Sequence, residues 1–145
     1  YRYDEILKTF LRAKCENCCT IPRSPAICLV CGIMVCAGDS CCRKEFGECN
    51  IHRERCSGAV GLFLLVRTAA LLLLTKETGA LLPAPYTNCF GEHDLDLKSD
   101  FALFLHRESY HDTLQPLWLN HEIRDFIYRN YADIRPNGAT LWGFI

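Results

Sequence analysis

Cysteine and histidine are the residues of this chain whose types and spacing could do chemistry. Eleven cysteines occur in 145 residues, and ten of them lie between positions 15 and 56. They form two knuckles and one mixed cluster: Cys15-x2-Cys18, Cys28-x2-Cys31 followed by Gly32, and Cys49-x2-His52-x3-Cys56. The tight turn of a knuckle directs two thiolates at one Zn²⁺ ion, and a glycine just after it relieves backbone crowding. The sequence therefore predicts a zinc-binding lobe.

Disulfide bonds and a catalytic thiol are the two competing interpretations of these cysteines. A disulfide framework usually distributes its bridges over the fold, whereas metal ligands cluster around an ion. The first fourteen residues are charged throughout, so they do not read as a secretory signal peptide. A thiolate bound to zinc is a ligand before it is a nucleophile. Metal binding is favoured over both alternatives.

The candidate zinc ligands outnumber the eight donors that two tetrahedral ions require. Side chains of adjacent residues point apart, so the pairs Cys18-Cys19 and Cys41-Cys42 are each expected to give one ligand per ion. Cys19 and Cys41 are the thiols left out, although the choice between Cys41 and Cys42 stays open. Two ions are favoured over three, and the grouping of ligands is not predicted. The nine candidates are Cys15, Cys18, Cys28, Cys31, Cys36, Cys42, Cys49, His52 and Cys56.

Hydrophobic periodicity predicts the elements that must position these ligands. Apolar residues recur at helical spacing over residues 3–11, which indicates an entry helix. The apolar runs 61–67 and 70–75 predict two strands, with a turn at 76–79 that leads into 80–86. An amphipathic helix is the alternative for the two runs.

The last third of the chain is expected to hold a short strand at 101–105 and then a helix. Pro116 should kink or divide that helix, because proline lacks the backbone N–H. Its apolar side chains form a stripe that we interpret as core: Tyr110, Leu114, Leu117, Trp118, Phe126, Ile127 and Tyr131.

The predicted fold class is α+β: a small zinc-stabilised, cysteine-rich lobe packed on a short antiparallel sheet with a C-terminal helix. Residues 1–57 would form the entry helix and zinc lobe, and residues 58–145 the sheet and helical part, as one compact unit. The net charge of −1 gives no electrostatic case for nucleic acid. The longest apolar stretch contains Arg67 and is too short for a membrane span. Because the chain begins at Tyr1, we expect it to be a fragment of a longer protein.

The polar and acidic segment 87–100 is expected to be a loop. Gly91, Glu92 and Asp94 are its candidate binding residues for a basic partner, and a structural turn around Gly91 is the alternative. Cys89 and His93 lie beside them, but nucleophile and base normally meet through the fold rather than along the chain. An enzyme that uses Cys89 is therefore the least favoured function.

The order of three motifs resembles a known family. "SPAICLVCGIMVCAGDSCC", then "GECNIHRERCSGAVGLFLLVR", then "PAPYTNCFGEHDLDL" are similar to the C-terminal region of the UBR-type E3 ubiquitin ligases, the N-recognins of the N-degron pathway. The likeness runs from about Pro25 to Leu119. One feature departs from it, because His93 stands where the family pattern leads us to expect threonine.

The resemblance implies a zinc-binding C-terminal domain of a very large, cytoplasmic or nuclear ligase. In that family a UBR box binds basic N-terminal residues, a RING recruits the E2, and the C-terminal domain packs against the rest and shapes substrate access. It implies metal binding by the matching residues Cys28, Cys31, Cys36, Cys42, Cys49, His52 and Cys56.

Two functions follow from these observations. A RING would close with a further Cys-x2-Cys, and none follows Cys56. The favoured function is therefore a non-catalytic zinc module that organises the ligase and contacts its other domains, substrate peptide or ubiquitin, while the parent protein is a RING-type ubiquitin transferase. The alternative is a stand-alone zinc finger that recognises a degron, a peptide terminus or ubiquitin.

Overall fold

Helices and strands are mixed along the chain, which the computed structural model describes over residues 2–37, 47–76 and 78–134. The α+β fold class is confirmed. The elements are α1 (Tyr3–Phe10), β1 (Pro25–Cys28), β2 (Met34–Cys36), α2 (Glu48–Cys56), β3 (Gly61–Leu65), β4 (Ala70–Leu74), β5 (Gly79–Pro83), β6 (Tyr86–Thr87), the 3₁₀ turn η1 (Leu95–Leu97), β7 (Phe104–Leu105), α3 (Arg107–Ser109), the π-helical turn η2 (Tyr110–Leu114), α4 (Gln115–Leu119) and α5 (Ile123–Ile134).

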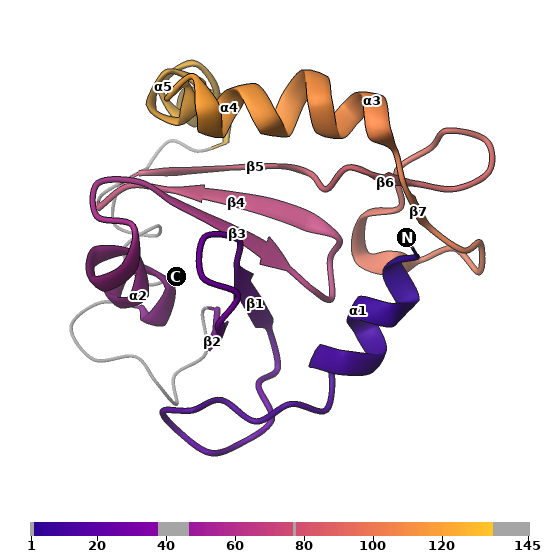
Figure 1. Cartoon of the computed structure of the whole chain (residues 1–145), viewed down its shortest axis with the longest axis horizontal. Helices are drawn as coiled ribbons and strands as arrows, with labels where there is room; N and C mark the ends of the chain where they lie inside the picture. The colour runs from indigo at the N-terminus through magenta and orange to yellow at the C-terminus, as the bar shows by residue number, and fades with distance from the viewer. Residues whose placement is uncertain (1, 38–46, 77, 135–145) are drawn as a thin grey trace.

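A five-stranded antiparallel sheet in the order β2-β1-β3-β4-β5 forms the centre of the molecule (Figure 1). The predicted entry helix and the strands at 61–67 and 70–75 are present, each a little shorter than expected. The sequence interpretation missed β1 and β2, which carry cysteines of the predicted zinc lobe. Because β1 pairs with β3, the cysteine-rich segment shares one sheet with the apolar strands.

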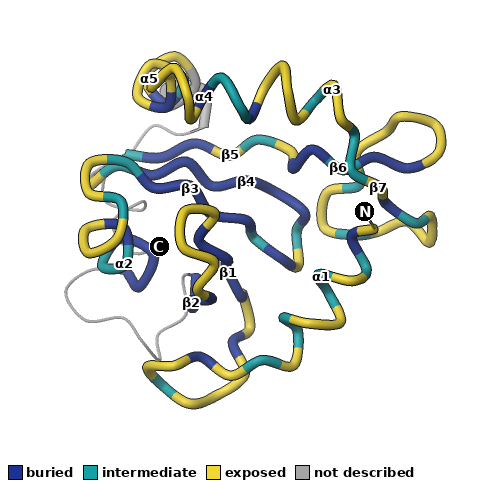
Figure 2. The backbone as a smooth tube through the Cα atoms, in the orientation of Figure 1, coloured by how far each residue is buried: buried dark blue, intermediate teal, exposed yellow. Residues whose placement is uncertain are grey.

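Side chains alternate between the two faces of this sheet, as the pleat requires. On one face Leu64 lies opposite Leu71, and helices α1, α4 and α5 cover it. We call this the helical face; its buried core includes Tyr3, Ile27, Leu62, Leu64, Leu71, Leu73, Leu114, Leu117, Ile123 and Ile127. The strands β1, β3 and β4 are buried along most of their length (Figure 2).

The opposite face packs against α2, and we call it the metal face. Phe63 lies opposite both Leu72 and Cys28, and all three side chains are almost completely buried. Gly61 is required where α2 crosses β3, because a Cβ atom there would come within 3.0 Å of the Arg53 Cγ atom.

Two expectations for the last third of the chain need correction. The strand at 101–105 is limited to Phe104–Leu105, because its partner β6 is itself only two residues long. The helical stripe is only partly core: Leu114, Leu117 and Ile127 are buried, whereas Tyr110 and Trp118 are 39% and 38% exposed. They are exposed because they lie at the edge of a groove, described below.

Pro116 lies at the start of α4, directly after the π-helical turn. A widened turn there is consistent with the missing proline N–H. The helix then ends, and α5 begins at Ile123. The helical segment therefore widens into a π-turn just before Pro116 but runs through the proline, and the break between helices comes after Leu119. In the described part of the chain, no helix has the length and apolar character needed to cross a membrane.

Candidate metal centres

The first candidate centre begins with the knuckle at the end of β1. The Gly32 N–H donates to the Cys28 carbonyl at 2.7 Å, and the Cys28 N–H donates to the Ile33 carbonyl at 2.9 Å. This turn holds Gly32 at a φ of +81°, a conformation that favours glycine. The knuckle thereby brings the sulfurs of Cys28 and Cys31 into one group.

Helix α2 supplies the other half of this centre. His52 and Cys56 are four residues apart, so they lie on the same face of the helix, one turn apart. The His52 ring packs edge-on against Phe63 of the metal face, with ring centroids 6.1 Å apart. The donor atoms of Cys28, Cys31, His52 and Cys56 all lie within 4.8 Å of one another.

The distances between these donors fit a tetrahedral zinc ion. Zinc–sulfur bonds of about 2.3 Å place two sulfurs about 3.8 Å apart, and a sulfur and a nitrogen about 3.6 Å apart. The Cys28 and Cys56 sulfurs are 4.0 Å apart, and the Cys31 sulfur is 3.2 Å from His52 Nε2. A disulfide requires about 2.05 Å between its sulfurs, far less than the distance between Cys28 and Cys56.

Electrostatics also favour a cation among these four side chains. Burial lowers the pKa of His52, which leaves its imidazole neutral and able to bind a metal. Burial disfavours the Cys31 thiolate, but hydrogen bonds from the Ile33 backbone and the thiols of Cys28 and Cys56 lower the pKa of Cys31 overall. Desolvation, helped by the contacts with Cys31 and Cys28, raises the pKa of Cys56 to about 11. Thiols that lie this close together resist ionising at the same time, because their thiolates repel one another. A bound divalent cation would offset this repulsion.

The second candidate centre joins the loop after α1 to strand β2. Cys15 and Cys36 are buried, and the Cys18 sulfur lies 3.9 Å from the Cys36 sulfur. The Cys19 N–H donates to the Cys15 carbonyl at 2.8 Å, which forms the knuckle turn. Among the described residues this group has three donors, namely Cys15, Cys18 and Cys36. The predicted ligand Cys42 and its neighbour Cys41 lie outside the described residues.

Contacts near this second group link it to the first. The Asn17 side-chain amide donates to the Glu48 carboxylate at the start of α2. The knuckle of the second group is therefore tied to the helix that carries donors of the first.

Cys49 occupies a different environment from the other candidates. It lies one turn before His52 on α2, is fully buried, and packs with Ala26, Phe63 and Leu72 on the metal face. Burial, together with the charges of Glu48 and Cys28, raises the pKa of its thiol. Within the described part of the chain, Cys49 is not a member of either donor group. Its role as a ligand stays a prediction.

Side chains of the acidic loop, residues 87–100, form hydrogen bonds with the backbone of the same loop. The Asn88 Oδ1 accepts from the N–H groups of Phe90 and Glu92, at 2.9 and 3.0 Å. Asp94 accepts from the backbone of Lys98 and Ser99, at 3.0 and 2.9 Å. These contacts give the loop an internal structure.

The predicted binding residues of this loop also have structural contacts. Gly91 has a φ of +79°, which favours glycine, and its N–H donates to the Asn88 carbonyl. The Glu92 carboxylate accepts from the Asn88 amide at 3.2 Å. His93 Nδ1 lies 3.1 Å from the Tyr86 carbonyl oxygen. The binding role of Gly91, Glu92 and Asp94 stays a prediction.

Residues 1–120 match the Proteolysis_6 C-terminal family. The chain belongs to this family. It is 36% identical over 138 residues to the E3 ubiquitin-protein ligase ubr1 of Schizosaccharomyces pombe, an alignment that covers 94% of this chain and 7% of the relative. It is 32% identical over 120 residues to human UBR3, which covers 82% and 6%, and 33% identical over 108 residues to PRT6 of Arabidopsis thaliana, which covers 74% and 5%.

These relatives confirm the resemblance to the UBR-type E3 ligases. The chain spans only 5–7% of the length of these Proteolysis_6 C-terminal relatives. It therefore corresponds to one E3 ligase module.

Proposed function

We propose that this chain is a non-catalytic zinc-binding module of a UBR-type E3 ubiquitin ligase of the N-degron pathway, acting in the cytoplasm or nucleus. The observation that carries the zinc role is the convergence of Cys28, Cys31, His52 and Cys56 from a strand end and a helix. Cys28 ends β1, Cys31 lies in the turn that follows it, and the other two donors come from α2, so one ion would join the helix to the sheet.

Helix α2 gains little stability from its length or from apolar packing. It is nine residues long, and isolated helices of fewer than about 12–15 residues are marginal in water. Four of its residues are buried, and three of these are Glu48, Asn50 and Arg53, which contribute little apolar area. A zinc ion bound by His52 and Cys56 would contribute folding free energy here.

The second centre would need one more ligand to become tetrahedral. Cys15, Cys18 and Cys36 supply three thiolates, and our prediction for the fourth is Cys42. Two bound ions that use both groups and Cys42 would leave four cysteines without an ion: Cys19 and Cys89, which are exposed, Cys49, which is buried, and Cys41.

Ubiquitin transfer, in this proposal, belongs to a RING elsewhere in the ligase. The zinc module would organise the ligase by contacting its other domains, substrate peptide or ubiquitin. The relatives are E3 ubiquitin-protein ligases, which supports the ligase assignment, and the donor groups support the structural use of metal.

Metal content under native, reducing conditions tests the proposal. Native mass spectrometry of the 145-residue chain should find two zinc ions per chain. An E2 discharge assay on the same sample should show no stimulation of ubiquitin release. A chain free of zinc that keeps its circular dichroism and melting curve would overturn the zinc role. Robust ligase activity of the chain alone would overturn the non-catalytic role.

A further inference from the structure

An apolar groove of about 540 Å³ lies on the helical face, between α1 and the α3–α4 segment. This volume falls within the range of about 300–1,000 Å³ that is typical of ligand pockets. Ile27 and Leu64 of the sheet form part of its floor, Ile6 and Phe10 of α1 form one wall, and Trp118 and Leu119 of α4 form the other.

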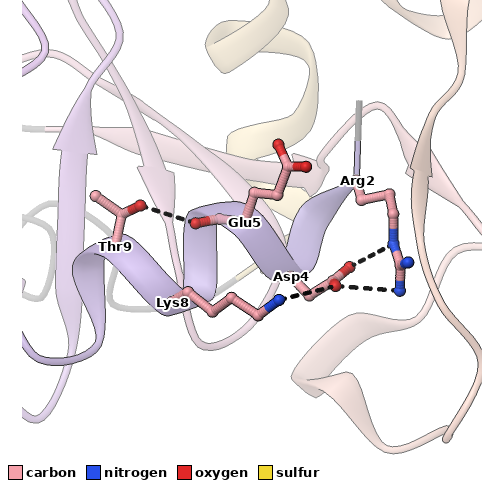
Figure 3. A network of polar contacts seen from close by, with 5 residues as sticks. All are labelled: Arg2, Asp4, Glu5, Lys8 and Thr9. Carbon is pink, nitrogen blue, oxygen red and sulfur yellow. Dashed lines mark hydrogen bonds and ion pairs between the residues drawn. The ribbon is translucent and has the colours of Figure 1, made fainter.

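The lining of this groove is uncharged. Within the described residues, no Asp, Glu, Lys, Arg or His side chain lines it. Charged residues of α1 are paired on the outer surface of the helix, where Arg2 and Lys8 lie 3.1 and 3.9 Å from the Asp4 carboxylate (Figure 3). Burial of a charge without a partner is costly. The groove therefore disfavours a peptide terminus or a charged side chain.

Four large side chains form an exposed rim. Leu29 is 41% exposed, Tyr110 39%, Trp118 38% and Leu119 60%. Leu29 lies between Cys28 and Cys31, so the knuckle of the first candidate centre fixes one side of the rim. Exposed apolar side chains around a cavity are typical of interaction sites.

The backbone around the groove selects the conformation of an occupant. Its two facing walls are α1 and the α3–α4 segment, whose main-chain groups are largely bonded along each helix, and Tyr86 of β6 and Leu105 of β7 line it as well. An extended segment lying between the two helices would lose water from its own N–H and C=O groups and would gain few partners from the helix backbones. A helix satisfies these groups internally and can insert apolar side chains at i, i+4 and i+7.

We propose that this groove binds an amphipathic helix that presents large, uncharged apolar side chains from an internal segment of a protein partner. The proposal goes beyond the zinc role. It depends on apolar packing of α1, α4 and the sheet, and it meets the metal centre only at Leu29.

Selection from a phage library of 16-residue helical peptides tests this proposal. The bait is the zinc-loaded 145-residue chain. The counter-bait is its Leu119→Asp variant, which changes an exposed rim residue. We expect enriched peptides to share uncharged apolar residues at i, i+3 or i+4, and i+7.

One enriched peptide, acetylated and amidated, is then titrated into three proteins. Leu119→Asp should weaken binding at least about tenfold, because a bound apolar peptide would bury the new carboxylate without a partner. The matched control is Leu81→Asp, because Leu81 is a similarly exposed leucine on β5, away from the groove, and it should bind as the unchanged chain does.

The absence of enrichment over the counter-bait would overturn the proposal. A consensus that requires a free charged terminus, or one of proline-rich extended peptides, would also overturn it. So would a dimer of this chain that buries Leu119. Zinc content and melting of Leu119→Asp are measured in parallel. Intact zinc binding together with a failed selection would reject the groove and leave the metal module standing.

Discussion

The two faces of the central sheet are built from the same strands but are covered by different kinds of side chain. On the metal face, a short helix with little apolar area meets the sheet at four metal-type donors. On the helical face, three helices meet it through a continuous apolar core, with a groove left between two of them. In our proposal, ligand chemistry would add to a small apolar cluster on one face, whereas the other face depends on buried apolar surface.

The two faces also differ in how rigid they are and in what they leave exposed to a partner. A tetrahedral metal centre fixes its ligands in one arrangement and uses every donor. Apolar packing is less demanding, and it leaves uncovered side chains such as Leu119 available to a partner. Leu29 is the point where the two faces meet, because it lies in the metal knuckle and on the groove rim.

The largest expected effect comes from breaking the metal face alone. Cys56→Ser removes one of four donors and should release one zinc ion per chain. It should also lower the free energy of unfolding by more than about 4 kcal/mol, since loss of a metal is among the most damaging changes. Zinc analysis and denaturant titration measure the two effects.

Cys89→Ser is the matched control for this prediction, since Cys89 is an exposed thiol outside both donor groups. It should change neither quantity. Equal behaviour of the two variants would contradict the difference that we draw between the faces.

An intermediate effect is expected from a cavity on the helical face. Leu71 is 1% exposed, and Leu71→Ala should cost about 2–5 kcal/mol. Because Leu71 points away from the metal face, the folded variant should keep the zinc content of the unchanged chain. Urea unfolding with parallel zinc analysis checks this, and zinc loss under native conditions would show that the faces are not independent.

The smallest expected effect concerns the hydroxyl of Tyr3. It donates to the Val66 carbonyl at 2.8 Å, and Tyr3→Phe should cost about 1 kcal/mol at neutral pH. Burial, together with Tyr86, raises the pKa of Tyr3 above its usual value of about 10. The folded state therefore holds the phenol proton more tightly than the unfolded state does.

This difference fixes the sign of the pH dependence. The contribution of Tyr3 is complete below pH 10 and is lost as the pH rises above 10. Thiols and Tyr86 titrate in both proteins, so their effects cancel in the comparison. The free energies of unfolding of the two proteins, measured from pH 7 to 11, should therefore converge at the alkaline end. Curves that stay parallel would contradict this assignment.

Much of this arrangement could be predicted from local patterns. Short apolar runs predicted β3 and β4, and helical spacing predicted α1 and a helical last third. Strands β1 and β2 were missed because cysteines interrupt their short apolar runs. Helix α2 was also missed, although Cys49, His52 and Cys56 follow the i, i+3, i+7 spacing of one helix face.

The sequence by itself determined which atoms can bind metal and to which family the chain belongs, because knuckle spacing and motif order are local properties. Only the tertiary structure decided which donors meet. Cys31 and His52 are far apart along the chain, and they converge because β1 pairs with β3 while α2 packs across the same face. The burial of Cys49 and the apolar groove arise in the same way, since both depend on elements that only packing brings together.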